Sequence, residues 1–237
     1  MEEEKKTNEL KDVTKELVGL EDNKLFRTLR GLTVLPGQTI KGYCRDDKKK
    51  FLAPIVYFIG VTALEMYIAS FIGLYDFMLK KSSEDLKRTL SDSAFTQFFD
   101  TEKVTQKVYD YVSFSTSEMG AKILTIPLLL LLTWLFYKKF NRSFKENSWF
   151  ALFTYAHATL LAIPLMLIWY LSGDLVLYST VSLISIFIYW VWASKQFYDL
   201  KLGKAIVIGF FMPITVFIAL NLMTFFVIII VFMSSTK

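Results

Sequence analysis

Apolar residues along the chain gather into five long blocks, separated by polar stretches that carry most of the charge. The blocks cover residues 51–79, 121–137, 149–171, 175–194 and 205–233. A helix of about 20 apolar residues is long enough to cross a hydrocarbon core about 30 Å thick. The pattern therefore predicts an all-α fold, a polytopic membrane helix bundle with about five transmembrane helices.

The predicted spans differ in length and in proline content. The second block is short, whereas the first and fifth are long enough to cross with tilt or with one end in the interface. Pro127, Pro164 and Pro213 lie inside the second, third and fifth spans. These prolines indicate ordinary kinks, and the alternative is the broken helices of a transporter.

Residues 80–120 form the longest polar loop between two blocks. Leu86, Leu90, Ala94 and Phe98 recur in it at four-residue spacing, and a second apolar stripe follows them. This spacing places apolar side chains on one face of a helix. We expect an extracytoplasmic helical loop, with two short amphipathic helices packed on the membrane or on the bundle.

Residues 1–50 precede the first span and form a separate N-terminal segment of reversed charge. Residues 1–22 hold eight Asp or Glu and four Lys, whereas residues 23–50 hold eight Lys or Arg and two Asp. The acidic part fits a short, weakly amphipathic helix or a disordered tail. No apolar stretch typical of a cleavable signal peptide lies near the start, so we expect the first block to act as an uncleaved signal anchor.

The basic part of this segment interleaves cations with apolar residues. Leu25, Phe26, Leu29 and Leu32 alternate with lysine and arginine, which is typical of an amphipathic helix lying in the headgroup region. Each cation near an anionic leaflet contributes about 1 kcal/mol of binding. The candidate headgroup contacts are Lys24, Arg27, Arg30, Lys48, Lys49 and Lys50.

Composition agrees with membrane insertion. Hydrophobic residues make up 54% of the 237 residues, aromatic residues make up 16%, and the mean hydropathy is +0.40. The formal net charge of +5 could indicate nucleic-acid binding, but the basic segments adjoin predicted spans. We therefore attribute the charge to cytoplasmic loops and expect no nucleic-acid partner.

The distribution of lysine and arginine predicts the orientation of the spans. Residues 41–50 contain five, residues 138–145 contain four and residues 195–204 contain three. Residues 172–174 contain none, and the C-terminal end contains one. Because cytoplasmic loops are enriched in these residues, we expect a cytoplasmic N-terminus and an extracytoplasmic C-terminus.

Few residues are available for chemistry. The chain has one cysteine, Cys44, and one histidine, His157, which exclude a disulfide framework and a multi-histidine metal site. No phosphate-binding loop, nucleophile elbow or zinc-binding pair is present. We expect no cofactor and no catalytic residues, and an intramembrane enzyme is the least supported class.

Glu65 lies in the middle of the first span and is the strongest candidate for an intramembrane polar site. A charged side chain at that depth costs about 2.5–3.5 kcal/mol on insertion scales, so it needs a partner or a proton. The candidate partners are His157 and Asn221. Such a site could relay a proton or bind a cation, or it could be a packing contact worth about 0.6 kcal/mol.

Several sequence stretches resemble a known family. A run of Pro36, Gly37, Ile40 and Tyr43 is followed by a basic cluster and Pro54. Together with residues 123–158 and 188–211, this run is similar to a bacterial membrane family described as domain of unknown function 3667. More distantly, the five-span plan with its amphipathic lead-in resembles the Yip family of trafficking membrane proteins. The resemblance implies placement in the bacterial inner membrane and implies no reaction.

The chain departs from the family pattern in two places. Relatives often begin with a cysteine-rich zinc ribbon, where this chain has an acidic segment. Relatives also tend to carry a Glu-His pair entering the third span, where Glu146 is followed here by Asn147. If those histidines have a metal or proton role in the family, the resemblance implies that this chain has lost or reduced it.

Three functions follow from these observations. The leading hypothesis is a non-enzymatic scaffold or adaptor that recruits partners or organises anionic lipids through its basic N-terminal helix. The second is a small transporter or channel that uses Glu65 and His157, as a homo-oligomer or with a membrane-protein partner. The third is a stress or defence effector that perturbs the membrane.

Overall fold

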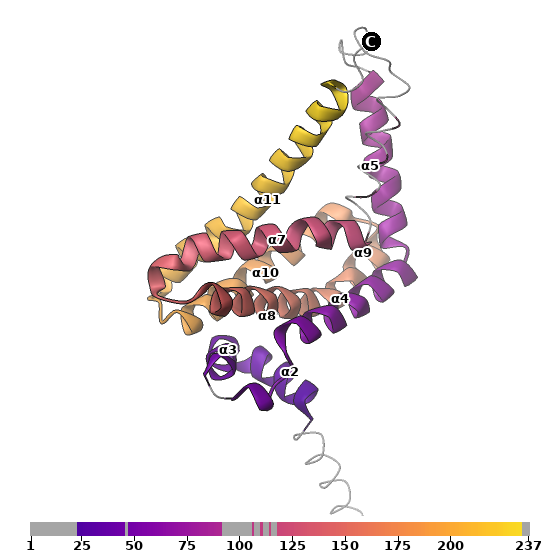
Figure 1. The fold of residues 1–237 in the computed structure, drawn as a ribbon. Helices are drawn as coiled ribbons and strands as arrows, with labels where there is room; N and C mark the ends of the chain where they lie inside the picture. The colour runs from indigo at the N-terminus through magenta and orange to yellow at the C-terminus, as the bar shows by residue number, and fades with distance from the viewer. Residues whose placement is uncertain are drawn as a thin grey trace, which may run out of the picture.

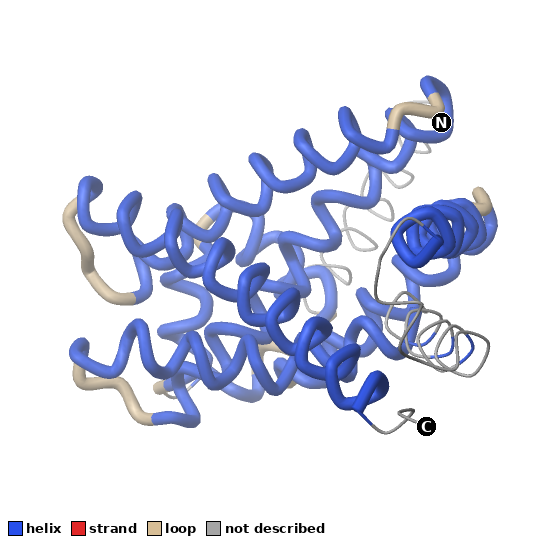
Figure 2. Tube along the Cα trace, turned by 90° about the horizontal axis from the view of Figure 1, so that it is seen from above, coloured by secondary structure: helices blue, strands red, loops and turns tan. Residues whose placement is uncertain are grey.

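The computed structural model describes residues 23–45, 47–91, 106, 110, 114 and 118–233, and these contain helices and connecting turns without strands. Figure 1 shows the helices in order along the chain, and Figure 2 shows the same arrangement from above. The predicted all-α fold is confirmed. The predicted acidic segment 1–22 and most of the predicted loop helices lie outside the described residues.

The helices follow one another with short connections. Their bounds are α2 Lys24–Val34, α3 Pro36–Cys44, η1 Asp47–Lys49, α4 Pro54–Phe71, α5 Leu74–Ser91, α7 Glu118–Tyr137, η3 Lys138–Phe140, α8 Phe144–Ala162, η4 Ile163–Leu165, α9 Met166–Ser172, α10 Leu175–Phe197 and α11 Leu202–Met233. In Figure 1, α7, α8 and α10 lie alongside one another, α2 and α3 lie below them, and α5 projects away.

Four helical segments of the described chain are long and apolar enough to cross a membrane. They are Pro54–Phe71, Phe144–Ser172, Leu175–Phe197 and Leu202–Met223. They coincide with the first, third, fourth and fifth predicted spans, so the membrane character of the chain is confirmed.

The second predicted span forms α7, which does not belong to these four. Lys122 and Lys138 enclose an uncharged stretch of 15 residues, 123–137. At 1.5 Å per residue this stretch covers about 22 Å, which is short of a hydrocarbon core of about 30 Å. The predicted count of about five spans is therefore confirmed for four of them.

The first span ends earlier than predicted. The sequence predicts a span over 51–79, but α4 ends at Phe71 and a turn separates it from α5. Gly73 adopts a φ of 76°, a left-handed conformation that glycine reaches without steric cost. Residues 74–79 therefore belong to a second helix, and Asp76 lies in the first turn of that helix, not in the span.

The three span prolines interrupt the helices to different extents. Pro164 lies in a 3-10 turn, η4, between α8 and α9. Proline has no N–H and clashes with the carbonyl four residues earlier, which explains the local change from α-helix. Pro127 and Pro213 lie within α7 and α11. The chain stays helical at all three positions, with a 3-10 turn at Pro164.

Side-chain caps define where three of the helices begin. The side chains of Asn23 and Asp174 accept hydrogen bonds from the first turns of α2 and α10. Ser143 and Glu146 form a reciprocal capping box at the start of α8. Glu146 therefore has a local structural role at the start of α8.

The α2–α3 hairpin is packed against the bundle, on α8 and α10. Leu32, Ile40 and Tyr43 are buried in this contact. At Gly37 an added Cβ would lie 2.3 Å from Cβ of Gln196 and 2.6 Å from the carbonyl oxygen of Ala193. The sequence predicts a helix that lies on the lipid surface, whereas the observed α2 has one face on protein.

Aromatic rings fill the end of the bundle next to α3. Tyr137 and Tyr198 stack with their centroids 4.1 Å apart, and Phe150 and Phe197 stack at 5.0 Å. The Trp190 indole N–H donates to the Tyr137 hydroxyl at 3.1 Å. These contacts join α7, α8 and α10, and they hold the loops at this end in place.

Candidate functional site

Glu65 forms an ion pair with Lys122, a residue that the sequence did not suggest as its partner. Oε2 of Glu65 lies 2.8 Å from Nζ of Lys122, and the two side chains are only 14% and 11% exposed. The contact is an ion pair without the angles of a well-aligned hydrogen bond. It joins α4 to α7 within the apolar part of the bundle.

Lys122 also contacts α8 through Tyr155. Nζ donates to the Tyr155 hydroxyl at 3.3 Å and lies 5.1 Å from the centroid of the same ring. One ammonium group therefore contacts a carboxylate, a hydroxyl and an aromatic face. Pairing a carboxylate with an ammonium group reduces the cost of burying either charge, which fits the position of Glu65 in a span.

His157 lies in a second polar cluster and is fully buried. The hydroxyl of Tyr57 lies 2.6 Å from Nδ1, and Oγ1 of Thr33 lies 3.1 Å from Nε2. Thr33 donates its one hydroxyl hydrogen to the carbonyl oxygen of Leu29 at 2.8 Å. Thr33 therefore accepts from Nε2–H and Tyr57 donates to Nδ1, which assigns the neutral tautomer protonated at Nε2.

The histidine cluster lies where four helices meet. Tyr189 of α10 packs its ring 5.2 Å from the His157 ring and donates from its hydroxyl to the Leu32 carbonyl at 3.0 Å. Tyr57 belongs to α4 and Thr33 to α2. His157 of α8 thus helps to attach the α2–α3 hairpin to the bundle.

The structure places Glu65 and His157 in different polar clusters. Glu65 pairs with Lys122, and His157 bonds to Tyr57 and Thr33. Asn221 lies on an exposed part of α11. The signal that could have pointed to Lys122 is its position as the single lysine of the second apolar block.

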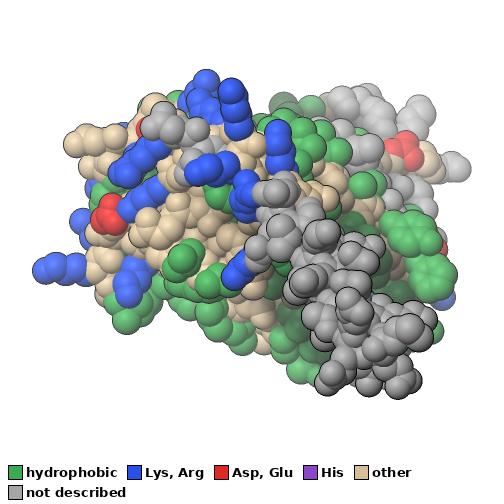
Figure 3. Space-filling model, turned by 90° about the horizontal axis from the view of Figure 1, so that it is seen from below, with side chains coloured by type: hydrophobic (Ala, Val, Ile, Leu, Met, Phe, Trp, Pro, Cys, Tyr) green, Lys and Arg blue, Asp and Glu red, His purple; other side chains and the backbone are tan. Residues whose placement is uncertain are grey.

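The predicted headgroup contacts lie around the α2–α3 hairpin. Arg27 is half-buried, and the others are exposed, namely Lys24, Arg30, Lys48, Lys49 and Lys50. Nζ of Lys48 lies 5.2 Å from the ring centroid of Trp149, and Nζ of Lys145 lies 5.0 Å from it. Figure 3 views the molecule from this side, where lysine and arginine side chains gather over one half of the surface.

A further lysine near this surface, Lys41, already pairs with a carboxylate of the same chain. Lys41 of α3 is buried, and its Nζ lies 2.6 Å from Oδ1 of Asp199 in the turn between α10 and α11. The N–H of Gly37 donates to Oε1 of Gln196 at 3.1 Å. These two contacts fix α3 to the end of α10.

Cys44 has no features of a catalytic thiol. It is partly buried at the end of α3, and burial together with the charge of Glu146 raises the pKa of its thiol to about 12. Burial also raises the pKa of the neighbouring Tyr43 hydroxyl. A thiol in this environment stays protonated near neutral pH and is a poor nucleophile.

The comparisons with known proteins concern the hairpin region. Residues 22–65 match the family model described as Protein of unknown function (DUF3667), which confirms the family resemblance over these residues. No curated protein and no solved structure matches the chain. The matched residues comprise α2, α3, η1 and most of α4, including Glu65 and Tyr57.

Proposed function

With residues 22–65 matching a family of unknown function, we propose that this chain is a non-enzymatic membrane scaffold. Its α2–α3 hairpin presents cations to anionic lipid headgroups at a fixed position on the bundle. The observation that carries the proposal is the attachment of the hairpin through Gly37, Lys41 and Thr33, beside exposed lysines. A rigidly attached cationic surface can organise lipids around itself or support a partner protein.

The proposal includes an orientation in the bacterial inner membrane, with the hairpin on the cytoplasmic side. Cytoplasmic leaflets are rich in anionic lipids, and cytoplasmic segments are rich in lysine and arginine. The hairpin, the η3 turn and the α10–α11 turn lie at one end of the bundle, and each carries such residues. The 172–174 turn carries none.

Trp149 offers a local reporter of lipid contact because it lies beside Lys48 and Lys145. The full chain is reconstituted into vesicles, and tryptophan quenching by brominated phosphatidylglycerol is compared with quenching by brominated phosphatidylcholine. Subtraction of the signal of Trp149→Phe isolates this residue from the other four tryptophans.

The decisive variant is Lys48→Gln/Lys49→Gln, and the charge-matched control is Lys80→Gln/Lys81→Gln on the exposed part of α5. Two cations at about 1 kcal/mol each correspond to about a thirtyfold preference for the anionic lipid. We expect the first variant to lose most of this preference and the control to keep it. Equal quenching of the wild-type chain by the two lipids would refute the proposal.

The Glu65–Lys122 pair favours a second candidate function, a small transporter or channel. A buried carboxylate paired within a span is a common element of proton or cation pathways. Proteoliposome flux of the wild-type chain is compared with that of Glu65→Gln across several cations and pH gradients. Flux in the wild type that Glu65→Gln abolishes would favour transport, and the absence of flux in both would exclude it under those conditions.

A further inference from the structure

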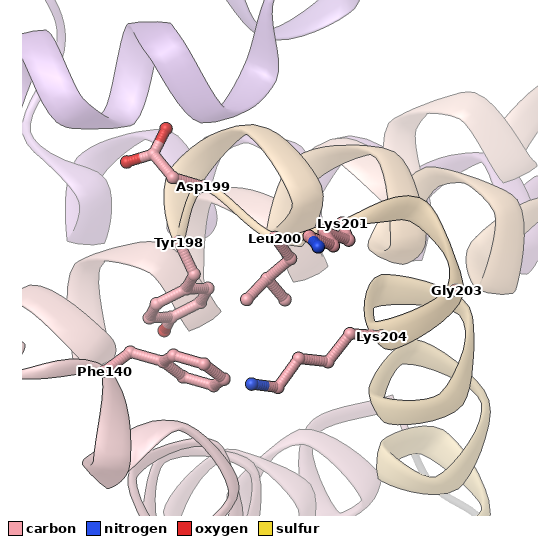
Figure 4. A pocket seen from close by; sticks show the side chains of 7 residues that line it. All are labelled: Phe140, Tyr198, Asp199, Leu200, Lys201, Gly203 and Lys204. Carbon is pink, nitrogen blue, oxygen red and sulfur yellow. The ribbon is translucent and has the colours of Figure 1, made fainter.

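A pocket of about 570 Å³ opens at the turn between α10 and α11. Figure 4 shows its lining side chains, which come from η3, from this turn and from the first turn of α11. They are Phe140, Tyr198, Asp199, Leu200, Lys201, Gly203 and Lys204. The pocket shares no lining residue with the two polar clusters, and its contact with the hairpin runs through Asp199 and Lys41.

Lys204 extends across the pocket toward Phe140 (Figure 4). Its Nζ lies 5.0 Å from the centroid of the Phe140 ring, and Nζ of Lys139 lies 5.6 Å from the same centroid. The Tyr198 ring packs beside Phe140 at 5.6 Å. The pocket thus combines the aromatic rings of Phe140 and Tyr198 with nearby ammonium groups.

Asp199, the one acidic residue that lines the pocket, forms an ion pair with a lysine that does not line it. The Asp199 carboxylate points away from the pocket in Figure 4, and its Oδ1 accepts from Lys41 Nζ at 2.6 Å. Lys201 and Lys204 therefore add two positive charges to a pocket whose one lining carboxylate is already paired with Lys41. This charge balance favours an anionic ligand.

An exposed apolar strip of α11 lies on the same face of the helix as Lys204. A Cβ added at Gly203 would meet no atom within 4 Å, so the space beside this residue is open. Val207 and Phe211 follow Lys204 at three- and seven-residue spacing and are 55% and 53% exposed. Residues at this spacing share one face of a helix. An anionic group in the pocket would therefore be adjacent to a surface that suits acyl chains.

We propose that this pocket binds the phosphate of an anionic glycerophospholipid. Lys201 and Lys204 contact the phosphate, and the acyl chains lie against the strip formed by Val207 and Phe211. The inference rests on the proposed function in placing this end of the bundle at a leaflet surface. It goes further by naming a discrete lipid site with its own residues. The apolar strip favours a lipid over free inorganic phosphate.

Native mass spectrometry of the delipidated full chain tests the site, with phosphatidylglycerol and phosphatidylcholine as probes. The variants are Lys201→Gln/Lys204→Gln, which removes the charges, and Gly203→Phe, which fills the open space. The matched control is Lys138→Gln/Lys195→Gln, which removes two exposed cations that do not line the pocket. Size-exclusion chromatography and circular dichroism confirm that each variant is folded.

We expect one tightly bound phosphatidylglycerol on the wild type and the control. Loss of two interfacial cations should weaken this binding about thirtyfold. If Gly203→Phe and the lysine variant both bind phosphatidylglycerol as the wild type does, the pocket proposal is wrong. In that case, if Lys48→Gln/Lys49→Gln lost the quenching preference for brominated phosphatidylglycerol, the proposed function would still be supported. Displacement by millimolar inorganic phosphate, with no dependence on acyl chains, would overturn the lipid assignment.

Discussion

The Glu65–Lys122 pair makes a prediction about stability that depends on how the pair is broken. The two charged atoms are 2.8 Å apart and largely shielded from solvent. At an effective dielectric constant of about 20 the attraction at this distance is about 6 kcal/mol. Desolvating each ion costs several kcal/mol, so the net contribution of the intact pair is small.

Removing one partner has a larger effect than removing both. Lys122→Met leaves the Glu65 carboxylate buried, and such uncompensated charges typically cost about 3–5 kcal/mol. We expect about 3 kcal/mol here, because polar contacts within membranes tend to be weaker than in water-soluble proteins. The double variant Glu65→Leu/Lys122→Met should recover most of that loss, since apolar side chains replace both ions.

The measurement is the free energy of unfolding in mixed micelles, from a titration with sodium dodecyl sulfate followed by circular dichroism. Lys195→Met serves as the control, because Lys195 is exposed on the last turn of α10. The reasoning would be refuted if Lys122→Met cost no more than the control. It would also be refuted if the double variant lost as much unfolding free energy as Glu65→Leu and Lys122→Met lose together.

Three further predictions concern the hairpin and its attachment. Gly37→Ala should destabilise the chain by about 1–3 kcal/mol, because its Cβ overlaps α10, whereas Gly60→Ala should be neutral or stabilising because its Cβ meets no atom within 4 Å. Hydrogen exchange of α3 should rise only in the first variant. Tyr57→Phe should cost about 1–3 kcal/mol by leaving Nδ1 of the buried His157 without its donor. An unchanged unfolding free energy would contradict this. Because burial and Glu146 raise the pKa of Cys44 to about 12, maleimide should label the folded chain slowly at pH 7 and faster as the pH rises toward that value. Rapid labelling at pH 7 in the folded state, equal to that in the denatured chain, would contradict it.

Periodicity and hydropathy predicted the fold class and the position of four spans, because these follow from local composition. They predicted the end of the first span poorly. Residues 74–79 remain apolar, and the break depends on the left-handed turn at Gly73. A glycine inside an apolar block reads equally well as part of a membrane helix, so the sequence offered no decisive signal there.

The partners in the polar clusters depended on helix rotation, which a single sequence does not encode. The sequence singled out Glu65 as a charge in need of a partner, and Lys122 reaches it from a helix more than 50 residues away. Likewise, the sequence predicts that Thr33 is one residue of a surface helix. Its contact with His157 exists because α2 packs across α8. Long-range pairing of this kind depends on the tertiary arrangement of the helices.

The attachment of the hairpin has a consequence for how the chain is made. Gly37 and Lys41 are synthesised early, but their partners Gln196 and Asp199 follow 159 and 158 residues later. At about 5–20 residues per second, a ribosome needs roughly 8–30 s to cover that interval. During this time the basic N-terminal segment lacks its contacts with the end of α10 and is open to the insertion machinery, to chaperones or to the bilayer surface. Contacts with α8 can form earlier, but complete docking of the hairpin can only follow the emergence of the fourth predicted span.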